Sequence, residues 1–173
     1  YELSTENARQ ALPRELPYKD AVYNVSRVGL LPAAMNPVVL AQAAQQGKSG
    51  VAAAPAQDAD TCACSGGTRE SAFADELAAA QAQSNALLFT ATQDKLHQPY
   101  RGALMPPSTE LIALFRSKGY AAAVSGAGPC VLVLHYGNAR EAIDQIASEQ
   151  LASGHWRVLH LPINTAGVEI ERR

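Results

Sequence analysis

Residues 121–134, which read AAAVSGAGPCVLVL, constrain the fold more than any other stretch of the chain. Two short apolar runs flank Ser125-Gly126-Ala127-Gly128-Pro129, and this pattern predicts a strand, a tight glycine loop and a second strand. Glycine tolerates positive φ, and loop amides outside strand pairing can point at an anion such as phosphate. The loop is not followed by the Gly-Lys-Ser/Thr of a P-loop, and a strand pattern follows where a dinucleotide fingerprint requires a helix. The pattern leaves open a phosphate-proximal loop and a plain turn between core strands.

The length, net charge and cysteine content of the chain limit which classes of protein it can belong to. The chain has 173 residues, enough for one domain with a substantial core, and a formal net charge of −2, which gives no basic footprint for nucleic acid. It has no apolar run long enough to cross a bilayer and no signal-peptide pattern at its start. Three cysteines give no disulfide framework and fit a reducing compartment. These features predict a cytoplasmic protein with neither nucleic acid nor a membrane as partner.

The first part of the chain reads as helices interrupted by prolines. Ser4 or Thr5 can cap a short helix that must end near Pro13. A second helix is expected to begin at Asp20 as its N-cap and to place Val22, Val25 and Val28 in the core. Pro32 and Pro37 predict a break near Leu31 and a further helical piece over residues 38–46.

Residues 47–68 differ in composition from the rest. They are rich in Gly, Ala, Ser and Asp without apolar periodicity, which is typical of a mobile insertion. Cys62 and Cys64 lie in this segment, but no second cysteine pair or suitably spaced histidine accompanies them, so no metal site is predicted. A helical pattern resumes at about Arg69.

Polar residues cluster in Asp94-Lys95-Leu96-His97-Gln98-Pro99-Tyr100-Arg101, where Pro99 is expected to end the preceding helix. Helix ends and loops carry most binding residues, so this cluster is a candidate site. His97 is interpreted as a hydrogen-bonded structural histidine. Arg101 is the better candidate for ligand binding, because a guanidinium can hold a carboxylate or a phosphate through two parallel hydrogen bonds.

The remainder predicts a helix capped by Ser108 and ended by Gly119, the strand pair, a helix from Asn138 or Ala139 to about Leu151, and strands over residues 156–163 and 165–173. This order suits an α+β fold, a ferredoxin-like antiparallel sheet with helices on one face.

Three stretches together resemble the C-terminal half of homoserine kinases, which belong to the GHMP small-molecule kinases: STENARQALP, DAVYNVSR with DKLHQPYRGALMPPS, and SGAGPCVLVL. The resemblance implies transfer of the γ-phosphate of ATP to the hydroxyl of L-homoserine, a step in threonine biosynthesis. It further implies that Arg9 and Arg101 hold the substrate carboxylate and that Ser125, Gly126, Ala127 and Gly128 form a loop beside the nucleotide phosphates. On pattern alone, Arg9 reads as a solvated surface charge.

The chain also departs from that family. The phosphate loop of the form P-x-x-x-G-L-G-S-S and the acidic magnesium ligand are missing. Residues 1–173 are therefore expected to form only the C-terminal domain, with ATP and Mg²⁺ bound mainly by an N-terminal half outside this sequence and with no activity of its own. Two other functions stay open: a free-standing amino-acid-binding or regulatory module, and a GHMP kinase for a sugar or mevalonate-type alcohol. A monomer and a homodimer also both stay open.

Overall fold

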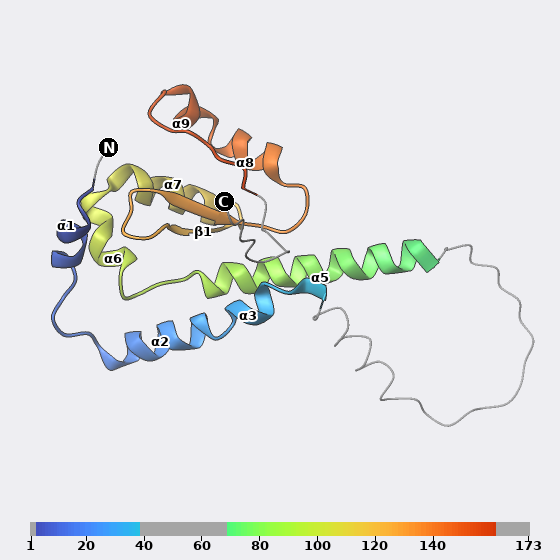
Figure 1. Cartoon of the computed structure of the whole chain (residues 1–173), viewed down its shortest axis with the longest axis horizontal. Helices are drawn as coiled ribbons and strands as arrows, with labels where there is room; N and C mark the ends of the chain where they lie inside the picture. Colours follow the sequence, from blue (N-terminus) through green and yellow to red (C-terminus); the bar gives the residue numbers. More distant parts are fainter. Residues whose placement is uncertain (1–2, 39–68, 162–173) are drawn as a thin grey trace, which may run out of the picture. The chain divides into compact units, whose positions relative to one another are not determined.

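The computed structural model describes residues 3–38 and 69–161, with only the backbone of residues 69–73. It divides into two compact units, residues 1–139 and 140–173 (Figure 1). The first unit contains helices α1 (Thr5–Gln10), α2 (Tyr18–Val28), α3 (Leu31–Ala34), α5 (Arg69–Ala91), α6 (Gln98–Arg101) and α7 (Pro106–Ser117), the short 3-10 helix η1 (Gly102–Leu104), and strands β1 (Ala121–Val124) and β2 (Val131–Leu134). The second contains α8 (Arg140–Ile146) and α9 (Ser148–Ala152).

The strand pair predicted from the glycine loop is confirmed. Strands β1 and β2 are antiparallel, with Ala121 opposite Leu134 and Val124 opposite Val131. Helix α7 packs against both strands, and α5 contacts β1 (Figure 1). Helices therefore cover a small antiparallel sheet, and the predicted α+β class is confirmed.

The core of the first unit lies where α3, α5 and the sheet meet. Leu88 of α5 is 2% exposed and clusters with the buried Ala34 and Ala121. Asn85 of α5 extends the contact, because its side-chain amide donates to the Tyr136 carbonyl at 3.1 Å and its oxygen accepts from the Tyr136 amide at 2.8 Å. This reciprocal pair fixes the chain after β2 against α5.

Three predicted roles at helix ends are wrong, and a nearby proline explains each. Helix α2 begins one residue after Pro17, so Asp20 lies in its first turn instead of at the N-cap. Helix α7 begins with two prolines, which leaves the Ser108 hydroxyl free to donate to the Pro129 carbonyl at 2.6 Å. Pro99 lies in the first turn of the short helix α6 and does not end α5, which ends at Ala91. Proline is favoured at a first helical turn, because its missing N–H would have no partner there.

The predicted core face of α2 is also wrong. Val22, Val25 and Val28 are 48%, 70% and 59% exposed in the part of the chain that the structure describes. The helix instead turns Tyr23 and Asn24 toward the segment after α5, through hydrogen bonds to Gln93 and Asp94. Polar contacts therefore decide which face of α2 packs inward.

The C-terminal unit differs from expectation in two respects. The helix predicted from about residue 138 to 151 is interrupted at Ala147 and forms α8 and α9. The strand predicted over residues 156–163 does not form at residues 156–161, which have no regular structure. Within this unit, His160 Nε2 lies 3.0 Å from Asp144 Oδ2.

Several predicted features lie outside the described residues. They are most of the helical piece over 38–46, the insertion over 47–68 with Cys62 and Cys64, and the terminal strand over 165–173. Among the helices that the structure describes, none has the length and apolar character needed to cross a membrane.

Candidate functional site

Arg101 joins two of the predicted site elements. Its Nε donates to the carbonyl of Ala8 in α1 at 3.0 Å, and its Nη1 donates to the carbonyl of Gly126 in the glycine loop at 3.4 Å. Ala8 is fully buried, and 93 residues of sequence separate it from Arg101. The structure therefore brings α1, α6 and the glycine loop to one place, as the sequence patterns did not by themselves require.

The glycine loop is held in shape from both sides. Its base closes through the Ser125 amide, which donates to the Cys130 carbonyl at 2.8 Å. Gly128 has a φ of +94°, and an added Cβ there would lie 2.5 Å from the sulfur of the buried Met105. Glycine is thus required at this position both by backbone conformation and by space.

The tip of the same loop is open. Gly126 has a φ of +63°, and an added Cβ there would meet no atom within 4 Å. Within residues 3–38 and 69–161, the amides of Gly126 and Ala127 donate to no acceptor. These two amides are therefore available to an anion, while Ser125 and Gly128 shape the loop through their backbone.

Arg9 follows Ala8 in α1, and its side chain is exposed. In the described part of the chain, its guanidinium forms no hydrogen bond or ion pair. Because the Ala8 carbonyl accepts from Arg101 Nε, one hydrogen bond links the side chain of Arg101 to the backbone of the residue before Arg9. Arg101 therefore lies against helix α1, which also carries Arg9. The exposed guanidinium of Arg9 has no partner among the described residues and is free for a ligand.

A carboxylate clamp holds the segment that leads to Arg101. Asp94 Oδ2 accepts from the amides of Gln98 at 2.7 Å and His97 at 3.0 Å, while Oδ1 accepts from the Leu96 amide at 2.8 Å and from Asn24 Nδ2 at 2.5 Å. His97 Nδ1 lies 3.3 Å from the same carboxylate, in keeping with the structural role predicted for it. Asp94 thus fixes the turn from which α6 and Arg101 start.

The charge of Asp94 is stabilised by these contacts. Burial favours the neutral acid and would alone raise the pKa of Asp94, but the hydrogen bonds from Asn24, Gln98 and Leu96 and the nearby His97 outweigh burial and lower the pKa. Asn24 completes the clamp by accepting from the Lys95 amide at 2.9 Å. The polar face of α2 is therefore attached to the candidate site at two points.

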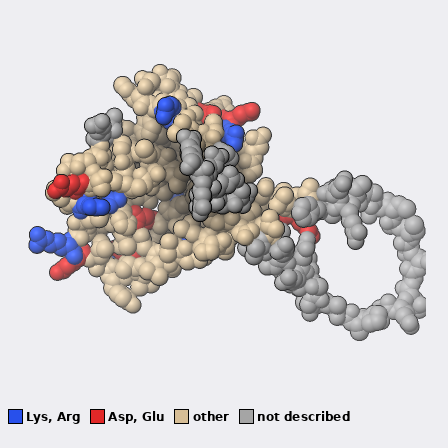
Figure 2. Space-filling model, in the orientation of Figure 1, with Lys and Arg blue, Asp and Glu red and all other residues tan. Residues whose placement is uncertain are grey.

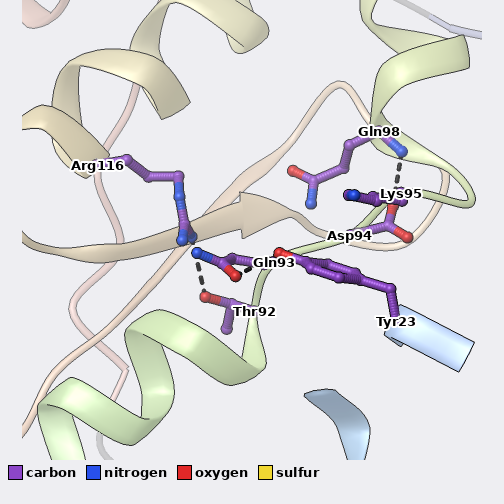
Figure 3. Close-up of a pocket in the computed structure, with 7 residues that line it drawn as sticks. All are labelled: Tyr23, Thr92, Gln93, Asp94, Lys95, Gln98 and Arg116. Carbon is purple, nitrogen blue, oxygen red and sulfur yellow. Dashed lines mark hydrogen bonds between the residues drawn. The ribbon is translucent and has the colours of Figure 1, made fainter. Parts of the chain in front are cut away.

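An open pocket of about 340 Å³ lies beside the clamp, between α2, the segment after α5, and α7 (Figure 3). Its polar lining comes from Tyr23, Gln93, Asp94, Lys95, Gln98 and Arg116. Tyr23 donates through its hydroxyl to Gln93 Oε1, and its ring lies 4.3 Å from Lys95 Nζ. The sequence predicted a candidate site over residues 94–101, which supplies Asp94, Lys95 and Gln98 to the lining. It did not predict that Tyr23 of α2 and Arg116 of α7 join them in one pocket.

Arg116 forms the wall of this pocket on the α7 side. Its Nη2 donates to the Phe89 carbonyl at 2.7 Å and its Nη1 to the Ala122 carbonyl at 3.0 Å, so it joins α7 to α5 and β1. Burial lowers the pKa of Arg116, an effect that the nearby Tyr23 partly offsets. The sequence did hold one signal for this residue, since Arg116 follows Ile112 by four positions on an otherwise apolar helix face.

Charged side chains are sparse and mixed on the face shown in Figure 2, where basic and acidic groups lie interspersed in a mainly uncharged surface. No group of three or more His, Cys, Asp or Glu residues suited to a metal ion occurs among the described residues. The donors of the site are thus guanidinium, ammonium, amide and backbone N–H groups, which suit carboxylate or phosphate oxygens better than a cation.

A protein-family model and several known proteins match this chain. Residues 71–152 match the family model "GHMP kinases C terminal". The chain is also similar to proteins named homoserine kinase: 32% identical to one from Clavibacter michiganensis and 33% to one from Leifsonia xyli, each over 98% of this chain, and 31% to one from Corynebacterium aurimucosum over 99% of it.

The chain spans about two fifths of the length of these relatives, 39%, 38% and 39% respectively. The family match covers α5 to α9, which include the Asp94 clamp, Arg101 and the glycine loop. The similarity to homoserine kinases extends it to α1 and α2, and both findings confirm the resemblance first drawn from the motifs. Residues 71–152 therefore match the C-terminal domain of GHMP kinases, within a chain that is similar over nearly its whole length to part of proteins named homoserine kinase.

Proposed function

We propose that this chain is the substrate-recognition part of a homoserine kinase, an enzyme that transfers the γ-phosphate of ATP to the hydroxyl of L-homoserine in threonine biosynthesis. The observation that carries the proposal is the hydrogen-bonded junction of α1, α6 and the glycine loop at Arg101. The similarity to homoserine kinases over nearly the whole chain supports the same substrate.

Arg101 and Arg9 are assigned to the carboxylate of homoserine. A guanidinium has five N–H donors, and the two that Arg101 uses within the protein leave three for a ligand. The internal bonds fix the plane of the guanidinium, so less side-chain entropy is lost when a carboxylate binds. Arg9, with its exposed guanidinium one residue from Ala8, supplies the second cation.

The glycine loop is assigned to the phosphate side of the reaction. The amides of Gly126 and Ala127 at its open tip fit phosphate oxygens, because a fixed N–H donor stabilises negative charge without reorganisation. ATP brought to this loop would supply the phosphoryl group, and Mg²⁺ would neutralise its charge. Among the described residues, no group of three or more His, Cys, Asp or Glu is suited to a metal ion, and ATP and Mg²⁺ are assigned mainly to protein outside this sequence.

The proposal also covers the setting of the enzyme. The exposed free thiol of Cys130 fits a reducing compartment, and we assign the protein to the cytoplasm. Alone, the chain is expected to fold without catalysing phosphoryl transfer, since it lacks the phosphate loop and the acidic magnesium ligand of the family.

The proposal is tested by measuring ADP release with ATP, Mg²⁺ and a panel of alcohols. Two proteins are compared: the 173-residue chain and a longer protein in which it follows an N-terminal half of the homoserine kinase type. Homoserine turnover by the longer protein but not by the chain is expected. Preference for a sugar or mevalonate would assign another GHMP kinase, and homoserine binding without turnover in the longer protein would assign a regulatory module.

A further inference from the structure

The pocket beside the Asp94 clamp is distinct from the assigned substrate site. Arg9, Arg101 and the glycine loop do not line it, and its lining residues come from α2, α7 and residues 92–98 (Figure 3). Gln98 is the link between the two places, because its Oε1 accepts from the amide of Val124, the residue directly before the loop. The proposed substrate site therefore does not explain why these polar side chains line the pocket.

The hydrogen bonds of the pocket leave donors and not acceptors free. Gln93 Oε1 accepts from the Tyr23 hydroxyl and from Arg27 Nε at 3.2 Å, which directs the Gln93 NH₂ group away from these partners. Gln98 Oε1 is likewise engaged by Val124. Within the described residues, the NH₂ groups of both glutamines have no acceptor. Lys95 Nζ lies over the Tyr23 ring, 4.3 Å from its centre, and the acceptor oxygen near it is that of Asp20, at a long distance of 3.8 Å. Three donors from one short segment thus border the same space.

The charges at the pocket sum to a small positive value. Among the lining residues, Lys95 and Arg116 supply two positive charges against one negative charge from Asp94, an excess of one. Both Asp94 oxygens already accept from N–H groups, so they do not compete for the free donors. One further negative charge would balance the cluster, which favours a monoanion over a doubly charged phosphate.

We infer that this pocket binds a small monocarboxylate of about amino-acid size, separate from the substrate carboxylate site. Carboxylate oxygens accept hydrogen bonds from amide NH₂ groups and from an ammonium, the donors that Gln93, Gln98 and Lys95 bring to this pocket. The volume of about 340 Å³ lies at the lower end of small-molecule sites. A ligand here would act on the glycine loop through the bond from Val124 to Gln98.

The inference is tested by titrating the 173-residue chain with sodium butyrate at constant ionic strength and following side-chain and backbone amides by NMR. The NH₂ signals of Gln93 and Gln98 and the backbone amide of Lys95 are expected to shift in a saturable way. Butyramide, the neutral analogue, and inorganic phosphate should each bind at least tenfold more weakly.

Gln93→Glu is the most selective variant, because it keeps an oxygen for Tyr23 and Arg27 but replaces the free NH₂ donor by negative charge. It should weaken butyrate binding at least tenfold, and Lys95→Met at least threefold. Lys118→Met removes an equal charge from an exposed position at the end of α7 and should change nothing. If Gln93→Glu fails to fold, Lys95→Met decides the test.

Four results would overturn the inference: equal shifts with butyramide, tighter binding of phosphate than of butyrate, unchanged affinity in the folded pocket variants, or butyrate shifts confined to Arg9, Arg101 and the glycine loop. Because this test uses no ATP and reads individual amides, its failure leaves the proposed kinase function standing. The kinase function can equally fail while butyrate binding holds.

Discussion

Replacing Asn24 by alanine is expected to release the segment that carries Arg101. Asn24 donates to the Asp94 carboxylate at 2.5 Å and accepts from the Lys95 amide at 2.9 Å, so the variant loses one charge-assisted and one neutral hydrogen bond. Such bonds contribute about 1.5–3 and 0.5–1.5 kcal/mol respectively. The free energy of unfolding should therefore fall by about 2 to 4 kcal/mol, since both partners are only partly exposed and water replaces the lost contacts incompletely.

The cost should also depend on pH. Because the folded state lowers the pKa of Asp94 below its ordinary value of 3.8, the stability from its ionised form is present above that value and lost as pH falls through the folded pKa. Asn24 supplies part of this lowering, so its removal should cost more at pH 7 than at pH 3. Urea unfolding of both proteins at the two pH values measures the difference.

Gln83→Ala is the matched control for this experiment, because it truncates an exposed amide on α5 and should cost less than about 0.5 kcal/mol. A cost for Asn24→Ala as small as the control, or one that does not shrink from pH 7 to pH 3, would refute the clamp. In that case, the orientation of α2 would have to come from its apolar residues.

Two further expectations concern stability and are measured by the same unfolding assay. Val25→Ser should change the free energy of unfolding by less than about 0.5 kcal/mol, because Val25 is 70% exposed. Leu88→Ala in the core should lower it by about 2–5 kcal/mol. Similar costs for the two variants would contradict the orientation of α2. Gly128→Ala should lower the free energy of unfolding by about 2–5 kcal/mol, because of its positive φ and the collision with Met105. Gly126→Ala should lower it by about 1–2 kcal/mol, because only the backbone conformation is unfavourable there. Equal costs would show that the Met105 side chain moves away without penalty.

The parts of the fold that the sequence predicted are those set by local chemistry. The apolar runs on either side of the glycine loop predict β1 and β2 because strand residues and a tight turn are local signals. The Ser4 side chain caps α1 as expected and accepts from the Glu6 amide at 3.2 Å. The α+β class follows from such elements in order.

The orientation of α2 could not be predicted in this way. Its valines recur at helical spacing and indicate a buried face, but the opposite side carries Tyr23 and Asn24, whose partners Gln93 and Asp94 lie some 70 positions away. Periodicity reports which side of a helix is apolar and not whether a stronger polar contact competes for packing. The helix ends at Pro17 and Pro106 were misassigned because a proline at a first turn and a proline that ends a helix look alike in sequence.

In the candidate site, too, the features set by local sequence were predicted and those set by distant contacts were not. Arg101 and the glycine loop were predicted from residue chemistry and from the family motifs, whereas the bond from Arg101 to Ala8 spans 93 positions and depends on the folded backbone. The pocket was missed because Gln93 and Arg116 acquire their meaning only from partners on other elements. The residue type alone does not tell whether a glutamine or arginine lies on the open surface or lines a pocket.

The most direct test of the account is the Michaelis constant for homoserine of Arg101 variants in the longer protein proposed above. Loss of a charge-assisted contact worth about 1.5–3 kcal/mol should raise this KM about 10- to 150-fold in Arg101→Ala, while kcat and the KM for ATP stay near their original values. Arg101→Lys keeps the charge but loses the planar fork, and should lie in between. Arg9→Ala should behave like Arg101→Ala. An unchanged homoserine KM in folded Arg101→Ala, or an equal rise in the KM for ATP, would contradict the assignment of Arg101 to the substrate carboxylate.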